Sequence, residues 1–300
     1  MPTITPGPPV TLGFRRILKP GRLLWLRAIA WLVFSIFVVA FAFGTASDAL
    51  TKLLADGGEF SAFVARCAGP LVALAAYALL VRFGEDRRPL EIGLRPALPE
   101  LGIGLMLGTA MFAAVMLILI GTGLYDFRPI GWLPAWKAAG ASIEAGVVEE
   151  IMVRGLILRL MWRAFGPAVA FGVSAAAFGI GHLGNENVTA FAIICIALEA
   201  GIMLGAFYAL SGRLWVSIGL HIGWNFAQGY LFGAAVSGEA LGSAAAISSA
   251  RSGFPQWLTG GPFGPEASLP ALLVCSAVGA ATLWLAWRAG RFAKDDPSPD

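Results

Sequence analysis

Apolar residues fall into long blocks along the chain, separated by short polar or glycine- and proline-rich segments. Most blocks are roughly 20 residues long, the length that an α-helix needs to cross a hydrocarbon core about 30 Å thick. None alternates with a period of two, which disfavours a transmembrane β-barrel. We therefore expect transmembrane helices at residues 28–43, 61–81, 101–123, 139–162, 166–182, 188–210, 214–232 and 269–287.

The composition supports lipid as the solvent. The chain is 58% hydrophobic and 13% charged, whereas about a quarter of the residues in a soluble domain are charged. The three cysteines, Cys67, Cys195 and Cys275, lie inside apolar blocks without CxxC spacing and are expected to be small buried hydrophobic residues. The fold class predicted is an all-α, polytopic transmembrane helix bundle of about eight spans.

Basic residues mark one side of an eight-helix zigzag. That side has Arg82, Arg87, Arg88, Arg95, Arg159, Arg163, Arg213, Arg288, Arg291 and Lys294, and the other has only Lys52, Arg128, Lys137 and Arg251. The positive-inside rule then predicts that both termini are cytoplasmic, in a bacterial plasma membrane. The net charge of +3 is small and spread over span ends, so no nucleic-acid partner is expected.

Ionisable residues inside the fourth block require an explanation, because each costs roughly 2.5–3.5 kcal/mol at mid-bilayer. Arg159, near the cytoplasmic end, is expected to snorkel toward water, as is Arg66 near the outer end of the second block. Glu144 is expected to meet headgroups or water. The trio Glu149, Glu150 and Arg154 lies too deep for that.

The spacing of this trio predicts two kinds of carboxylate. Glu150 and Arg154 are four residues apart on one helix face and are expected to pair. Glu149 is rotated from Glu150 by about 100° and is expected to point to a different neighbour. This arrangement indicates a structural acid beside a chemical one, and a purely structural ion-pair network is the alternative.

Both histidines of the chain lie in or at the edge of apolar blocks. His182 follows Phe178 by four residues, and His221 precedes Asn225 by four. Glu199, in the sixth block, is expected to hydrogen-bond a neighbouring helix and is left without a role. Three helices thus bring carboxylates, an imidazole and an imidazole–amide pair toward one cavity. These groups suffice to activate a water and stabilise an oxyanion.

The same residues resemble a known family. Residues 149–155, Glu-Glu-Ile-Met-Val-Arg-Gly, resemble the EExxxR-G motif of the CPBP intramembrane proteases, the CAAX-processing and bacteriocin-processing (Abi) group. Residues 178–182 resemble its FxxxH motif, and residues 221–225 its HxxxN motif. The three motifs occur in order, each on a predicted helix. The resemblance covers about residues 143–230 and implies a catalytic core of four helices.

The resemblance implies an intramembrane endopeptidase that hydrolyses a peptide bond in a membrane-associated, prenylated or peptide precursor. Carried over by position, Glu149 is the general base and His182 helps to hold the attacking water. His221 and Asn225 stabilise the oxyanion. The membrane and a peptide or protein substrate are therefore the expected partners.

The resemblance also implies a role for Glu150 and Arg154 and raises the question of a metal cofactor. Glu150 with Arg154 is implied to support the geometry of the site. The family is commonly described as a metalloprotease, and Glu149, His182 and His221 could ligate a catalytic Zn²⁺ with a fourth position open to water. The same residues serve equally as a metal-free acid–base set. The metal is left open.

The chain is divided accordingly into a cytoplasmic tail (1–22), N-terminal transmembrane helices (23–135), a protease core (136–235), a non-cytoplasmic loop (236–268), a last transmembrane helix (269–288) and a cytoplasmic tail (289–300). Loop 236–268 is either a plain connection or a cover over the site. A first helix that stays uncleaved is favoured over a signal peptide. The segment 294–300 is expected to be disordered.

Competing functions are constrained by what the sequence lacks. It contains no HExxH motif, no GxSxG-like serine and no aspartate within the predicted spans, which disfavours other intramembrane protease types. A catalytically silent scaffold or immunity protein remains an alternative, as does a proton-coupled transporter. Nothing in the sequence identifies the substrate or the oligomeric state.

Overall fold

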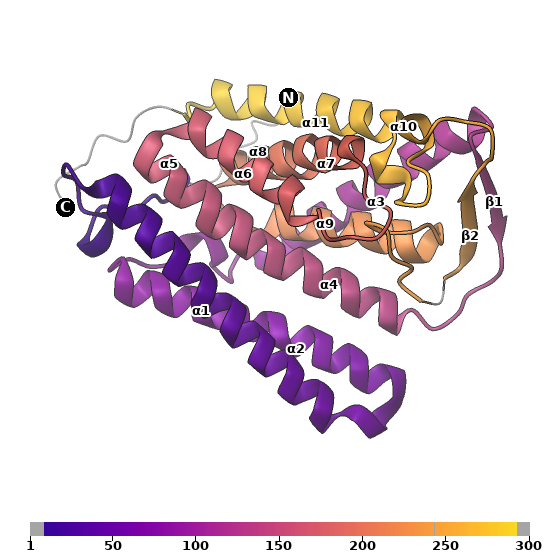
Figure 1. Ribbon diagram of the computed structural model, residues 1–300. Helices are drawn as coiled ribbons and strands as arrows, with labels where there is room; N and C mark the ends of the chain where they lie inside the picture. Colours follow the sequence, from indigo (N-terminus) through magenta and orange to yellow (C-terminus); the bar gives the residue numbers. More distant parts are fainter. Residues whose placement is uncertain (1–8, 243, 293–300) are drawn as a thin grey trace.

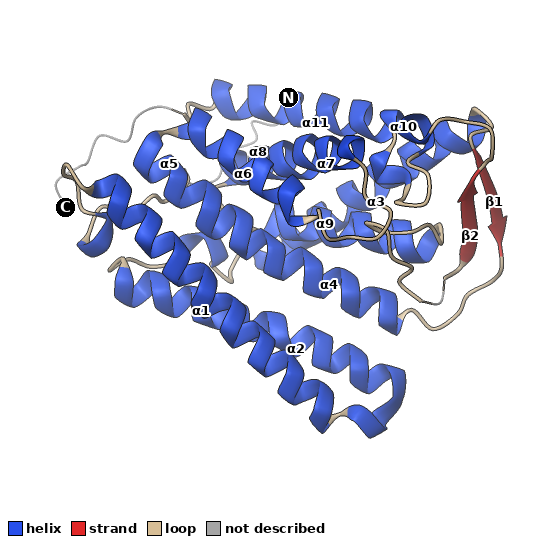
Figure 2. Cartoon of the chain, in the orientation of Figure 1, coloured by secondary structure: helices blue, strands red, loops and turns tan. Residues whose placement is uncertain are grey.

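The chain folds into an elongated bundle of helices (Figures 1 and 2). The computed structural model describes residues 9–242 and 244–292. Its α-helices are α1 (Leu24–Leu53), α2 (Gly58–Leu79), α3 (Ala97–Gly121), α4 (Trp136–Glu150), α5 (Arg159–Phe165), α6 (Pro167–Gly181), α7 (Ala190–Ile196), α8 (Gly205–Ser211), α9 (Trp215–Phe226), α10 (Gln256–Thr259) and α11 (Leu269–Arg288). The predicted all-α fold class is confirmed.

Short segments of other helical geometry connect or extend these helices. The π-helical segments are Leu80–Gly84 after α2, Ile151–Leu158 between α4 and α5, Ala197–Leu204 between α7 and α8, and Ala227–Leu231 after α9. The 3₁₀ turns are Arg16–Leu18, Ala55–Gly57, Leu90–Ile92 and Pro265–Ala267. Segments of π-helix shift which side chains share a face and often lie at functional sites. Two of them carry polar residues discussed below.

The chain is a multi-pass membrane protein. Five helices in the described part are long and apolar enough to cross a membrane: Leu24–Leu53, Ala55–Gly84, Ala97–Gly121, Ala190–Ser211 and Leu269–Arg288. The other three predicted spans also form helices. Of these, 136–165 is rich in ionisable residues, and 167–181 and 215–231 are shorter. The count of eight spans therefore stays a prediction.

A two-stranded antiparallel sheet stands at one end of the bundle (Figure 2). Strand β1 (Tyr125–Pro129) pairs antiparallel with β2 (Ala246–Ala250), with Tyr125 opposite Ala250. Strand β2 lies within segment 236–268, so this segment is anchored to the connection that follows α3. The sequence analysis did not predict this pairing.

Glycines bring α3 and α9 into close contact. A Cβ placed on Gly108 would lie 2.1 Å from the carbonyl oxygen of Leu220, and one on Gly223 would lie 2.4 Å from that of Leu105. Gly104 and Gly219 make similarly close backbone approaches. Small residues four apart are the usual means of such packing between membrane helices. Helix α3, outside the predicted core 136–235, thus fixes the helix that carries the HxxxN motif.

We expect Gly108→Ala to destabilise the protein by about 1–3 kcal/mol, because the added methyl group forces the backbones of α3 and α9 apart. Thermal unfolding in detergent would measure the loss. Gly102→Ala is the matched control on the same helix, because a Cβ there meets nothing within 4 Å. Equal melting temperatures for the two variants would contradict the packing described.

The end of the bundle near α5 is held by a buried ion-pair network, and the prediction that Arg159 snorkels is wrong. Arg159 is fully buried and donates from both terminal nitrogens to Glu85, at 2.8 and 2.7 Å. Arg87 bonds both Glu85 and Glu91. The connection after α2 folds beneath the α4–α5 span and supplies these acids, which local sequence around Arg159 does not indicate.

Only parts of the two predicted tails are described. Residues 1–8 and the predicted disordered segment 294–300 lie outside the described residues. The described part of tail 1–22 is not free of the bundle, since Val10 and Leu18 belong to its hydrophobic core. Arg163 also donates to the carbonyl oxygens of Gly13 and Leu18, at 2.8 Å each.

Candidate active site

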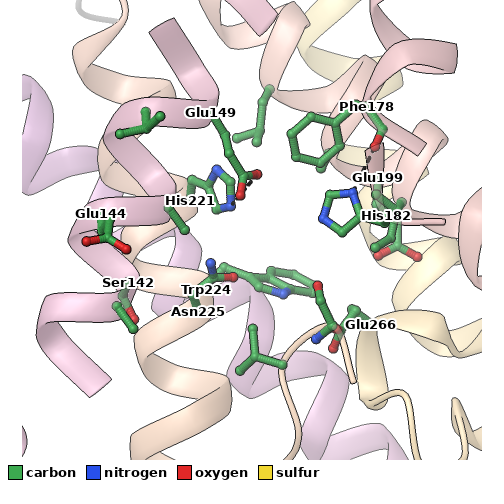
Figure 3. Close-up of a pocket in the computed structure, with 18 of the residues that line it drawn as sticks. Ser142, Glu144, Glu149, Phe178, His182, Glu199, His221, Trp224, Asn225 and Glu266 are labelled. Atoms are coloured by element: carbon green, nitrogen blue, oxygen red, sulfur yellow. Dashed lines mark hydrogen bonds and ion pairs between the residues drawn. The ribbon is translucent and has the colours of Figure 1, made fainter. Parts of the chain in front are cut away.

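The three motifs converge on one cavity of about 380 Å³. Glu149 from α4, Phe178 and His182 from α6 and its C-terminal end, and His221 and Asn225 from α9 all line it (Figure 3). The helices that carry them are continuous with apolar spans, so the cavity lies inside the bundle. Polar side chains far apart in the sequence therefore share one space.

His221 is held between the two adjacent carboxylates. Its Nδ1 lies 3.1 Å from Oε1 of Glu150, and its Nε2 lies 3.9 Å from Oε2 of Glu149. The prediction that Glu149 and Glu150 point to different neighbours is wrong, because one imidazole is wide enough to meet both through opposite ring nitrogens. Glu150 is fully buried, whereas the side chain of Glu149 is 37% exposed to the cavity.

Arg154 pairs with Glu150, as predicted. The Nη1–Oε1 distance is 2.8 Å, and both side chains are completely buried. Nη2 of Arg154 also donates to the carbonyl oxygen of Ala200, and its guanidinium lies 4.8 Å from the ring centre of Phe178. Arg154 thus ties α4 to α6 and to the π-helical segment Ala197–Leu204, and it neutralises the acid behind His221.

His182 lies across the cavity from Glu149 and His221 (Figure 3). It follows the last residue of α6, and its Nδ1 is 2.8 Å from the carbonyl oxygen of Phe178. Because a carbonyl oxygen only accepts hydrogen bonds, Nδ1 carries the proton and Nε2 is left for the cavity. The ring is therefore oriented by its own helix.

Asn225 presents its side-chain amide to the same cavity. Among the described residues no hydrogen bond holds this amide, so its N–H groups are available to a bound molecule. The i, i+4 relation places it one turn beyond His221, as the sequence predicts. The motif residues are thus brought together, with Glu150 and Arg154 packed directly behind them.

Five further acidic or basic residues of the described part of the chain line the cavity, and one of them, Glu239, belongs to the loop described below. Arg66 and Glu144 lie on its wall, and the expectations that Arg66 snorkels and that Glu144 meets headgroups or water stay predictions. Glu199 also lines it, and in the described part of the chain it has no hydrogen bond to another helix, contrary to prediction. Glu266 was missed entirely, because a lone acid in a glycine- and proline-rich segment gives no sequence signal.

Segment 236–268 closes over the cavity, which decides between the two alternatives for this loop. Val236, Ser237, Glu239 and Leu241 contribute to the lining. The amide of Asn185 donates to the carbonyl oxygen of Ser237 at 3.0 Å, and so anchors the segment beside the C-terminal end of α6. The loop is therefore a cover and part of the site.

The arrangement does not fit a three-ligand metal centre. Within residues 9–242 and 244–292, no three His, Cys, Asp or Glu side chains are grouped closely enough to hold a metal ion. Glu149 and His221 face each other, but His182 stands on the far wall (Figure 3). Each imidazole leaves its Nε2 atom facing the cavity, so the residue types are suitable as metal ligands. Their spacing is not, because they are too far apart to bind one ion.

Comparison with known proteins places part of the chain in a family. Residues 131–227, about a third of the chain, match the family model of "Rce1-like: Type II CAAX prenyl endopeptidase Rce1-like". No curated protein and no solved structure matches the chain. The matched segment spans α4 to α9 and contains all three motifs. The chain is thus a multi-pass membrane protein whose residues 131–227 match the Rce1-like CAAX prenyl endopeptidases of the CPBP family, as the motifs predict.

Proposed function

We propose that the chain is an intramembrane endopeptidase of the CAAX type that cuts a peptide bond with a water activated by Glu149 and His221. One observation carries the proposal. Oε2 of Glu149 and Nε2 of His221 are 3.9 Å apart at the wall of the cavity, too far for a direct hydrogen bond and suited to hold one water between them. The family match supports a membrane protease in general.

The hydrogen bonds around His221 set the direction of proton transfer. Nδ1 donates to Glu150, so Nε2 is an acceptor when the ring carries this one proton. A water beside Glu149 then donates one hydrogen to the carboxylate and one to Nε2, and its lone pair points into the cavity. As that oxygen attacks the peptide carbonyl, Glu149 takes the proton as general base.

This assignment exchanges the roles that the resemblance implies for the two histidines. His221 holds the water, and Asn225 is left as the amide donor to the developing oxyanion. His182, whose Nδ1 is engaged by the carbonyl oxygen of Phe178, presents Nε2 to hold a peptide N–H of the substrate on the opposite wall. Glu150 and Arg154 act by fixing the ring of His221.

The substrate and the membrane orientation are further parts of the proposal. A cavity inside the bundle suits a substrate that is itself held in the bilayer, such as a prenylated peptide or a membrane-associated precursor. The basic residues near the ends of α2, α5, α8 and α11 support cytoplasmic termini in a bacterial plasma membrane. In that orientation the covered end of the cavity faces away from the cytoplasm.

A direct test uses purified protein in liposomes and a peptide with an S-farnesylated cysteine followed by two aliphatic residues and a C-terminal alanine. We expect mass spectrometry to detect cleavage after the cysteine by the wild-type protein. Intact peptide after prolonged incubation would remove prenylated peptides from the proposal. Proton-coupled flux without cleavage would favour a transporter, and neither would favour a scaffold.

The proposed mechanism uses no metal ion, and this part is tested by chelation. We expect the rate of peptide cleavage to stay within about twofold after dialysis against 1,10-phenanthroline, because the chain's own groups supply the base and the oxyanion donor. Loss of cleavage that added zinc restores would contradict the metal-free mechanism. Elemental analysis of the dialysed protein would verify that no zinc remained.

A further inference from the structure

Two carboxyl groups in the same cavity are not used by the mechanism above. Glu199, from the π-helical segment Ala197–Leu204, is 4% exposed, and Glu266, from the turn Pro265–Ala267, is 6% exposed. Both line the cavity, away from Glu149 and on the side of His182 (Figure 3). Oε1 of Glu199 and Oε2 of Glu266 have no hydrogen-bond partner among the described residues. Each acid therefore has one buried oxygen whose hydrogen-bonding capacity is unused in the described part of the chain.

The surroundings of these acids favour their neutral forms. Glu266 interacts electrostatically with Glu199, with the hydroxyl of Tyr125 and with the thiol of Cys195, none of which is a cation. Its hydrogen-bond donors are the backbone N–H and the hydroxyl of Ser237 and its own backbone N–H, and none of them is a cation. Burial raises the pKa of Glu266 to about 8. Two buried carboxyl groups that interact without a counter-ion do not both ionise at neutral pH.

The cation of the cavity lies elsewhere. Arg66 is the only arginine or lysine among the described residues that line the cavity, and its electrostatic partner is Glu144. Glu149, by contrast, is partly exposed and faces an imidazole. One cavity thus contains acids in two different environments, one beside an imidazole and one buried without a cation. That division is how enzymes assign a base and an acid to the same reaction.

We propose that Glu199 and Glu266 share a proton and donate it to the departing amine of the cleaved peptide bond. The proposal rests on the proposed function, which leaves the source of that proton open. The pair joins the family-matched core to segment 236–268, since Glu266 lies outside residues 131–227. Segment 236–268 would then supply one of the two acids that protonate the leaving amine.

The proton moves in a closed cycle. Water gives a proton to Glu149 and its oxygen bonds the carbonyl carbon. The C–N bond then breaks as the nitrogen takes the shared proton, which leaves an acid product, a neutral amine and, transiently, two carboxylates in the pair. The proton held by Glu149 returns to the pair through water and restores the starting state.

The dependence on the leaving group tests this step. The probes are the farnesylated peptide and its thioester analogue, in which sulfur replaces the scissile N–H, because a thiolate leaves without a proton. We expect Glu266→Gln and Glu199→Gln to slow amide cleavage about 10²-fold and thioester cleavage less than about threefold. Wild-type amide cleavage should fall as the pH rises through about 8, where Glu266 loses its proton.

Infrared spectroscopy tests the proton itself without any substrate. We expect the purified wild-type protein at neutral pH to show the C=O stretching band of a neutral carboxylic acid, reduced in Glu266→Gln and in Glu199→Gln. Glu239→Gln is the matched control, because Glu239 lines the same cavity but is exposed. Its spectrum should match that of the wild type in this region.

The outcomes separate the proposal from the proposed function. Equal losses for amide and thioester, or a neutral-acid band unchanged in both variants, would overturn the proton-donating role. If Glu149→Gln cleaves both probes at the wild-type rate, the proposed function fails instead. If the wild-type protein cleaves neither probe, the infrared comparison alone decides whether the pair holds a proton.

Discussion

Glu149→Gln should lower the rate of peptide cleavage by about 10³-fold, while the protein still inserts and folds. Glutamine keeps the size of the side chain but cannot take a proton from the water beside His221. The exposed side chain of Glu149 makes no ion pair at the distance of a hydrogen bond, so its loss removes little stability. The rate of cleavage of the farnesylated peptide in liposomes is the measurement.

Glu144→Gln is the control for this variant. Glu144 lies on the same helix and lines the same cavity, but no described contact joins it to His221. We expect its cleavage rate to stay within about threefold of the wild type. The role of Glu149 would be refuted if both variants lost activity equally, or if the melting temperature of Glu149→Gln fell along with its rate.

Arg159→Met should destabilise the protein by roughly 3–5 kcal/mol, the usual cost of removing one partner from a buried ion pair. Methionine keeps much of the apolar stem, so the loss reports mainly on charge. Glu85, completely buried, would keep only Arg87 as a cationic partner. Unfolding by sodium dodecyl sulfate in mixed micelles, with tryptophan fluorescence as the readout, would measure the change.

An exposed pair of the same chemistry provides the comparison for Arg159→Met. Arg251 and Asp126 are 2.8 Å apart, with side chains 51% and 62% exposed, and Arg251→Gln should cost less than about 1 kcal/mol. Burial by itself raises the pKa of Glu85, but the guanidinium groups of Arg159 and Arg87 outweigh it and lower that pKa. This stabilisation is present at neutral pH and is lost on acidification, more so in the wild type than in Arg159→Met. Similar losses for the two substitutions would contradict the buried network.

Local features of the site were predictable from the sequence. The apolar blocks identify the helices because a span must satisfy its backbone internally. The pair Glu150–Arg154 and the turn from His221 to Asn225 follow from a separation of four residues on one helix. These relations need no knowledge of which helices are neighbours. The three motifs and their convergence on a single cavity were therefore predicted together.

Contacts between distant segments were not predictable in the same way. Arg159 meets Glu85, 74 residues away, only because the connection after α2 folds beneath the bundle. Glu266 enters the cavity because segment 236–268 is anchored by the β1–β2 pairing and by Asn185. The shared contact of Glu149 and Glu150 with His221 depends on how closely α9 approaches α4. The pattern of apolar and polar residues within one segment does not predict how close that segment lies to another.

A double-mutant cycle on Glu149 and His221 tests the shared water most directly. If Glu149 and His221 hold and activate the same water, substituting either residue removes nearly all of the rate enhancement that this water provides. The account predicts that Glu149→Gln, His221→Gln and the double variant cleave the farnesylated peptide at similar rates, each about 10³-fold below the wild type. Losses that multiply in the double variant, or four equal rates, would contradict it.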